Sequence, residues 1–316
     1  NACLSRLACL FFAWFFARFG TDAPPPETAM QLDAELIEHT DMVLPSCPEI
    51  LTELFSMLGQ SDLDLRNVAA LIAADPALFG MVLRKANSVT ESRQVSLRDP
   101  LQAVTRLGVQ RVLSIASAVA APSAFPELPH AFAERFWQLS RATAEAARLV
   151  SHKIPGHTED DAYLFGLFRD CGIPLLMIHH SDYQDMLQEA ITQNVPSTHV
   201  EYQRYDTNHA LVGGLIALHW KMPDEIVLAI RHQHDAVLFG EGGGTMPPHI
   251  RTLAAMGFFA AAAARHALGE IEDPEWTWCG RQAATYLGYN SKEAEELVQD
   301  VAEALREVKQ AGGSLF

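Results

Sequence analysis

Four polar side chains in largely apolar surroundings have the types and spacing to do chemistry: Arg169, Asp170, His209 and His234. Arg169 and Asp170 are adjacent, inside the mostly apolar stretch Gly166–Gly172. Buried charges are costly without partners, so this pair either reaches a polar pocket or points outward. A carboxylate and histidines from other helices could hold a divalent metal, which in hydrolases lowers the pKa of bound water and supplies hydroxide at neutral pH.

The histidine spacing argues in part against a metal. His232 and His234 are two residues apart, so on one helix they point about 200° from each other and cannot both bind one ion. His179 and His180 also diverge, and they lie at a predicted helix end, where the helix dipole favours histidine. The residues alone leave two interpretations open, a metal site and a network of buried ion pairs.

The charge and the cysteines exclude some functions. The formal net charge of the 316-residue chain is -16, and no run of lysine and arginine interrupts the acidic balance. Such a surface repels DNA and RNA phosphates, so nucleic acid is not an expected partner. The five cysteines form no CxxC pair or spaced framework, which is typical of a reducing compartment. We therefore expect a cytoplasmic protein.

The first thirty residues differ from the rest. The segment Leu7–Ala17 is entirely apolar, is flanked by Arg6 and Arg18, and precedes a stiff linker at Pro24–Pro26. A helix of that length rises about 17 Å, against about 30 Å for the hydrocarbon core of a bilayer, so it cannot span a membrane alone. One prediction is that residues 1–22 contact the inner-membrane surface or a partner helix; packing or disorder is the other.

The pattern from Met30 onward predicts an all-α protein, because apolar residues recur at helical spacing without sustained alternation. Helix starts are marked at Asp64, Asp75-Pro76 and Asp99-Pro100, and Ser46–Glu49 offers a capping box. A break at Ala121–Pro126 suggests a seam. We predict an N-terminal segment with its linker at 1–30, a helical bundle at 31–125 and a second helical half at 126–316.

The second half is predicted to contain seven helices. Asn290 and Glu293 form a capping pair ahead of the last one. The approximate predicted ranges are Phe132–His152, Asp160–His180, Asp182–Gln193, Asn208–Trp220, Asp224–His234, His249–Leu268 and Ser291–Lys309.

Seven short motifs follow one another along the chain: Leu44–Glu49, Asp75–Leu78, Ala86–Ser88, Ala103–Gly108, Gly166–Gly172, His209–Gly213 and Trp220–Ile226. They resemble, in the same order, the motifs LPxxP, DPxL, ANS, AVxxLG, GLLHDIG, HxxVG (here shifted by one) and WxLPxxI of the HDOD domain family. This family is a bacterial signalling relative of the HD-domain phosphohydrolases. The resemblance covers about residues 40–240, roughly two-thirds of the chain.

The resemblance implies a two-part, all-α fold in which an N-terminal bundle packs on a half derived from the HD fold. It also implies where the metal ligands of active HD hydrolases would fall, namely at an early His, a His-Asp doublet and a late Asp. Here Leu139 takes the place of the early His, Arg169 that of the doublet His, and apolar residues fill Leu253–Met256. Asp170, His209 and His234 remain.

An arginine stays protonated and donates no lone pair to a metal, so the resemblance implies a degenerate site without metal or cofactor. We expect a non-catalytic regulatory scaffold that contacts signalling proteins. Two alternatives stay open. One is a divergent metal-dependent phosphohydrolase that uses Asp170, His209 and His234, and the other is a regulator that binds a messenger nucleotide through Arg169.

Overall fold

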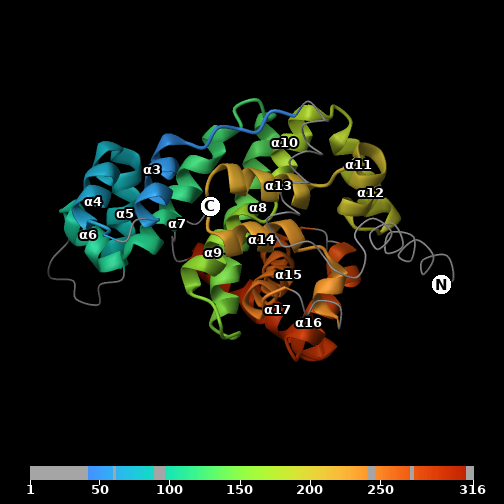
Figure 1. Ribbon diagram of the computed structural model, residues 1–316. Coiled ribbons are helices and arrows are strands. Elements are labelled where there is room, and N and C mark those ends of the chain that lie inside the picture. Colours follow the sequence, from blue (N-terminus) through green and yellow to red (C-terminus); the bar gives the residue numbers. More distant parts are fainter. Residues whose placement is uncertain (1–41, 60–61, 89–96, 241–245, 271–273, 311–316) are drawn as a thin grey trace. The chain divides into compact units, whose positions relative to one another are not determined.

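The computed structural model describes residues 42–59, 62–88, 97–240, 246–270 and 274–310 (Figure 1). Every regular element in these ranges is a helix, which confirms the all-α prediction. Chain contacts group residues 1–42 and 43–316 into separate units, and all helices below belong to the second unit. The predicted apolar segment and proline linker at 1–30 lie outside the described residues. No helix within the described ranges is long and apolar enough to cross a membrane.

Among the described residues, five helices precede the segment Ala121–Pro126. They are α3 (Glu49–Leu58), α4 (Leu65–Ala74), α5 (Pro76–Ser88), α6 (Pro100–Leu107) and α7 (Val109–Ala120). The predicted caps at Asp64, Asp75 and Asp99 are confirmed, because each carboxylate accepts a backbone N–H of the following helix at 2.8–3.1 Å. The capping box predicted at Ser46–Glu49 is wrong. Pro48 occupies the cap position in an extended conformation, and no side chain caps α3.

Ten α-helices follow this segment in the ranges that the structure describes. They are α8 (His130–Ser151), α9 (Glu159–Phe168), α10 (Gly172–His179), α11 (Tyr183–Gln193), α12 (Ser197–Tyr205), α13 (His209–His219), α14 (Asp224–His232), α15 (Pro248–Leu268), α16 (Arg281–Tyr286) and α17 (Ser291–Gln310). The capping pair of Asn290 and Glu293 is confirmed by reciprocal hydrogen bonds of 2.9 and 3.0 Å. The sequence did not predict α12 or α16. The division near residue 125 remains a prediction.

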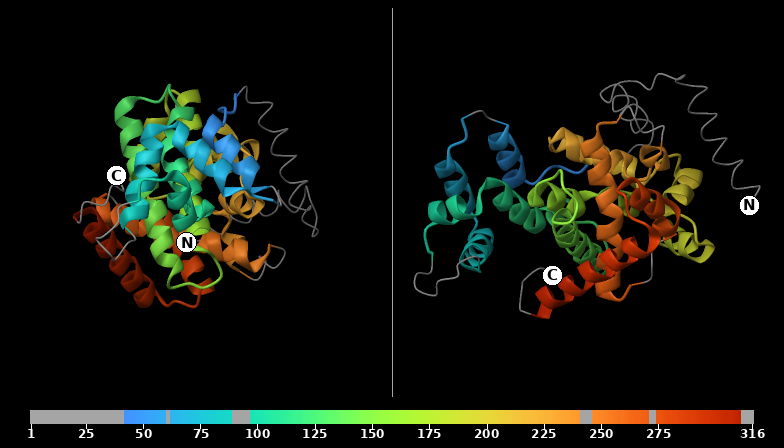
Figure 2. Two further views of the ribbon diagram at one scale, coloured as in Figure 1. Left: turned by 90° about the vertical axis from the view of Figure 1, so that its left-hand side faces the viewer. Right: turned by 90° about the horizontal axis from the view of Figure 1, so that it is seen from below.

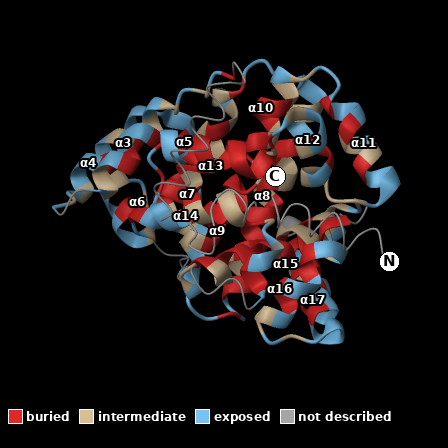
Figure 3. Cartoon of the chain, turned by 45° about the vertical axis from the view of Figure 1, so that its right-hand side comes forward, coloured by how far each residue is buried: buried red, intermediate tan, exposed pale blue. Residues whose placement is uncertain are grey.

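The long helices α8 and α15 form the centre of this half. Helix α8 packs against both α9 and α15, and α15 also packs against α17, as the views in Figure 2 show. Helix α13 is buried along most of its length, so it has no polar face of the kind a surface helix shows. Figure 3 shows the buried positions gathered on these central helices. The candidate site residues extend from the ends of helices in this core.

One predicted helix, Asp160–His180, is two helices in the structure. Helix α9 ends at Phe168 and α10 begins at Gly172, so Arg169 and Asp170 lie at a helix end. Pro174 explains the break, because its ring would clash with the carbonyl of residue 170 in a continuous helix and it has no N–H to donate. Because Arg169 and Asp170 lie between two helices, their side chains are not fixed on the face of a continuous helix and can point into the core.

Two motifs that are far apart in sequence meet directly. The indole Nε1 of Trp220 donates a hydrogen bond of 2.9 Å to the carbonyl of Pro45, and Trp220 is almost fully buried. Its ring also meets the ring of Phe168 edge-on, with centroids 5.8 Å apart. Phe168 is the residue before Arg169, so this contact ties the chain ahead of α3 to the end of α9.

Candidate functional site

Asp170, His209 and His234 come together although 64 residues separate the first from the last. One ligand atom from each lies within 4.8 Å of the others. The Nε2 atoms of the two histidines are 3.0 Å apart, and His209 Nε2 is 3.8 Å from Asp170 Oδ1. His234 follows the end of α14, whereas His232 pairs with Asp235 at 2.7 Å. The divergence predicted for the two histidines therefore leaves only His234 in the site.

Arg169 points into the site and not toward solvent. Its side chain is about 95% buried, and its Nε lies 3.1 Å from Asp170 Oδ1. Its Nη1 donates to the carbonyl of Gly257 on α15, and its guanidinium lies over the Phe258 ring at 5.8 Å. Burial alone would raise the pKa of Asp170, but the charges of Arg169 and the histidines outweigh burial and lower this pKa. Asp170 is therefore an ion-paired carboxylate.

Glu201 of α12 holds His209 in place. Both carboxylate oxygens lie 2.9 Å from His209 Nδ1, and one accepts the backbone N–H of His209 at 2.8 Å. The hydroxyl of Tyr183 donates to the same carboxylate at 2.6 Å. Burial lowers the pKa of His209, but Glu201 and Asp170 more than offset this and raise it to about 9. The same contacts keep the pKa of Glu201 below its ordinary value despite burial.

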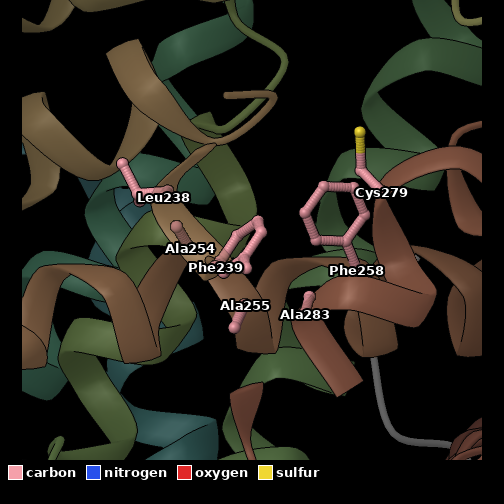
Figure 4. Packing of buried hydrophobic residues seen from close by; sticks show 7 residues of the cluster. All are labelled: Leu238, Phe239, Ala254, Ala255, Phe258, Cys279 and Ala283. Carbon is pink, nitrogen blue, oxygen red and sulfur yellow. The ribbon is translucent and has the colours of Figure 1, made fainter. Parts of the chain in front are cut away.

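His234 has an equivalent partner in Glu275, which precedes a short π-helical turn at Trp276–Gly280. The Nδ1 atom of His234 lies 2.5 Å from Glu275 Oε2, and the side chains of both residues are buried. The ring also meets Phe258 edge-on. Phe258 belongs to a buried apolar cluster (Figure 4) that also contains Leu238, Phe239, Ala254, Ala255, Cys279 and Ala283.

The sequence interpretation missed Glu201, Glu275 and Tyr183. None of them occurs in one of the seven motifs. Their separation along the chain from His209 and His234 also matches no known spacing of paired residues. The one signal is their type, since a glutamate buried among apolar residues needs a cationic partner, but burial is not visible in sequence. The structure brings the four predicted residues Arg169, Asp170, His209 and His234 together.

The hydrogen bonds assign the protons in the site. A carboxylate accepts and cannot donate when ionised, so each histidine donates from Nδ1, His209 to Glu201 and His234 to Glu275. The two Nε2 atoms are close enough to hydrogen-bond, and one of them must then carry a proton. With its pKa at about 9, His209 keeps its proton at neutral pH and can donate from Nε2 to Nε2 of His234.

This donor set does not fit a resident divalent metal. The three donors are close enough for one ion, and a cation there would have to displace the proton that the two Nε2 atoms share. The Arg169 guanidinium bonds to Asp170, the carboxylate among the three donors. The expected position of the late Asp, Leu253–Met256, is a buried apolar stretch of α15. We therefore derive no metal chemistry from this site.

The fold and the adjacent Arg169-Asp170 at a helix end define an all-helical protein of the HD-related class. The family model of the HDOD domain matches residues 44–236, so the chain belongs to the HDOD family. This family is a signalling-type family related to HD metal-dependent phosphohydrolases. The resemblance found in the seven motifs is thereby confirmed.

Solved structures show the same fold. An HDOD domain protein of unknown function from Geobacter sulfurreducens superposes with a TM-score of 0.64 at 20% identity, covering 92% of this chain and 99% of that one. A proposed phosphohydrolase from Shewanella amazonensis SB2B gives 0.62 at 22% identity, with coverage of 89% and 97%. At these identities the likeness extends to the fold alone.

A sequence relative is an uncharacterised protein of Treponema pallidum (strain Nichols). It is 24% identical over 209 residues, which is 65% of this chain. The chain spans 40% of the length of that relative.

Proposed function

We propose that this chain is a non-catalytic regulatory module that acts through contacts with signalling proteins. The HDOD family supports a signalling role, and the arrangement around Asp170 supports the absence of catalysis. The observation that carries the proposal is the buried guanidinium of Arg169 bonded to Asp170, at the position where the family motif has histidine.

Each carboxylate of the network has a basic partner. Glu201 and Glu275 each pair with a histidine, and Asp170 pairs with Arg169. The proton on the histidine pair supplies positive charge that a metal would supply in a hydrolase. A module of this kind keeps the helices α9, α12, α13 and the segment after α14 locked together without needing a cofactor.

The competing function is a divergent metal-dependent phosphohydrolase. It is favoured by the short distances between the donor atoms of Asp170, His209 and His234. It requires a cation to displace the shared proton from the histidines and to tolerate Arg169. The messenger-nucleotide alternative has less support, because Arg169 already donates to Asp170 and Gly257.

Metal analysis and a turnover assay on one protein sample separate these functions. Purified protein should contain less than stoichiometric metal and should not hydrolyse p-nitrophenyl phosphate or its bis ester with Mg²⁺, Mn²⁺ or Fe²⁺. Asp170→Asn is the matched variant. One bound metal per chain together with turnover that disappears in Asp170→Asn would establish the hydrolase and end the scaffold proposal.

We also propose that residues 1–22 attach the protein to a membrane surface or a partner helix. The apolar segment between Arg6 and Arg18 supports this proposal. Deletion of residues 1–22 should move the protein from the membrane fraction to the supernatant. Identical fractionation of the full-length and shortened proteins would contradict it.

A further inference from the structure

A second cluster of charged side chains, most of them half-buried, lies where α7 and α8 both approach α9. Arg111 of α7 lies over the ring of Tyr163 at 5.4 Å, and its Nη1 is 3.6 Å from Asp160 Oδ1. The hydroxyl oxygen of Ser114, one turn further along α7, lies 3.4 Å from the same carboxylate and 3.1 Å from the carbonyl oxygen of Gln110. The polar face of α7 is therefore turned toward the start of α9.

Helix α8 contributes the opposite side. Arg141, Glu145 and Arg148 follow one another at spacings of four and three, so they share one helix face. Arg148 donates two hydrogen bonds to Oε1 of Glu145 and one of 3.0 Å to Glu159 of α9. Tyr163 is fully buried, and the charges of Glu145, Arg111 and Arg141 all act on its hydroxyl.

The cluster holds more cations than carboxylates, although the whole chain carries a net charge of -16. Arg148 forms ion pairs with Glu145 and Glu159, and Arg111 forms one with Asp160. Lys85 of α5 and Arg141 form no ion pair within 4.0 Å in the described part of the chain. Burial and the guanidinium groups of Arg111 and Arg148 lower the pKa of Lys85 and outweigh the opposite effect of Glu145 and Glu159.

Several buried polar atoms of the cluster also lack a hydrogen-bond partner among the described residues. They are Arg111 Nη1, Arg141 Nε and Glu145 Oε2; the Asp160 oxygen paired with Arg111 Nη1 lies at 3.6 Å, beyond hydrogen-bond distance. Buried donors and acceptors are nearly always satisfied, so a group of them in one place points to a missing ligand. The two guanidinium nitrogens can donate to an oxygen atom, whereas the carboxylate oxygen can only accept.

We propose that Lys85, Arg111 and Arg141 bind a phosphate group at the meeting point of α5, α7, α8 and α9. Guanidinium groups match phosphate oxygens in charge and geometry, and a lysine adds a point charge. Glu145 Oε2 accepts a hydrogen bond from an O–H of the ligand. The ligand class is hydrogen phosphate or a phosphoester that carries a neighbouring hydroxyl. Its site joins helices from both sides of the segment Ala121–Pro126.

The carboxylate of Glu145 sets the specificity. At neutral pH inorganic phosphate keeps a proton and can donate to Glu145, whereas sulfate has none and meets an unrelieved negative charge. The wild-type protein should therefore prefer phosphate to sulfate by about tenfold or more, which is the effect of one lost charge-assisted hydrogen bond. Glu145→Gln offers an N–H donor instead and should remove this preference.

The test is isothermal titration of the full chain with inorganic phosphate, sulfate and glycerol 3-phosphate. Arg141→Met and Lys85→Met keep the apolar stems of both side chains, and each should weaken phosphate binding about tenfold or more. Lys292→Met removes an exposed cation on α17 and should leave binding unchanged. Circular dichroism confirms that each variant is folded. Tighter binding of phosphate than of glycerol 3-phosphate identifies the free anion, and the reverse identifies a phosphoester.

Two results would overturn this inference. One is the failure of wild-type protein to bind any of the three compounds at millimolar concentration. The other is phosphate binding that Arg141→Met and Lys85→Met leave intact, because the anion would then bind elsewhere. Asp170→Asn should bind phosphate like wild type, so the phosphate site and the proposed non-catalytic function stand or fall separately.

Discussion

At the scale of single residues, Glu201 determines how the site is charged. It is fully buried and satisfies the ring and the backbone N–H of His209 together with the hydroxyl of Tyr183. Removing its charge leaves a buried cation uncompensated. Glu201→Gln should lower the free energy of unfolding by about 3 kcal/mol at pH 7, measured by urea denaturation.

The control for this change is Glu296→Gln. Glu296 pairs with Lys292 on the exposed face of α17 and is 61% exposed, so its loss should not be resolved in the same experiment. Equal effects of the two substitutions would show that the Glu201–His209 pair does not hold the site together.

The pH dependence follows from the direction of the pKa shift of His209. Its pKa is raised from 6.5 to about 9, so its contribution to stability is complete below pH 6.5 and is lost as the pH rises toward about 9. The difference in unfolding free energy between wild type and Glu201→Gln should therefore shrink between pH 6.5 and 9.5. Urea denaturation across this range measures it. A constant difference would mean that His209 is not protonated in the folded protein.

At the scale of helices, the site depends on the close approach of α10 and α13. A Cβ atom added at Gly172 would lie 2.1 Å from the carbonyl oxygen of His209 and 2.8 Å from the amide nitrogen of Gly213. Both are backbone atoms, which cannot move aside as a side chain can. Gly172→Ala should destabilise the protein by about 2–4 kcal/mol, measured by thermal or urea unfolding.

Gly80 is the matched control within α5. An added Cβ there meets nothing within 4 Å, and the position is exposed inside a helix. Gly80→Ala should be neutral or stabilising by up to about 1 kcal/mol, because alanine favours the helix. Destabilisation of the same size at both glycines would exclude close helix packing as the cause.

The contact between Trp220 and Pro45 gives a second prediction at this scale. Trp220→Phe retains an aromatic ring but loses the hydrogen bond to the buried carbonyl, and should cost about 2 kcal/mol of unfolding free energy. Trp278 also donates from its indole, to the carbonyl of Asn194 at 3.1 Å, but is 38% exposed. Trp278→Phe should therefore cost clearly less. The reverse order would contradict the role given to the Pro45 contact.

At the scale of the whole molecule, the described fold should not depend on a metal. Arg169 and the one proton shared by His209 and His234 offset two of the three negative charges of Asp170, Glu201 and Glu275. Each of these acids also lies beside a side chain that can donate a hydrogen bond to it, so we expect that the fold needs no metal cation. Treatment with EDTA should leave the thermal unfolding midpoint unchanged. A decrease that added Zn²⁺ or Mn²⁺ reverses would show that metal binding contributes to folding.

Much of the fold could be predicted because local signals agreed with it. Asp64, Asp75 and Asp99 cap helices wherever they were expected, since capping involves neighbouring residues in the chain. The break in the predicted helix Asp160–His180 also had a local signal, Pro174, which outweighs the apolar pattern around it. Helix α12 was missed because its sequence is polar and its burial is limited.

The family, the helical class and the four residues of the candidate site could be predicted from the sequence, because short motifs and helical periodicity are properties of neighbouring positions. The inability of Arg169 to ligate a metal also follows from its residue type. The inward direction of Arg169 and the pairing of Glu201 and Glu275 with the histidines became visible in the folded structure alone. Such pairs join distant helices, and no spacing along the chain encodes which buried acid meets which base.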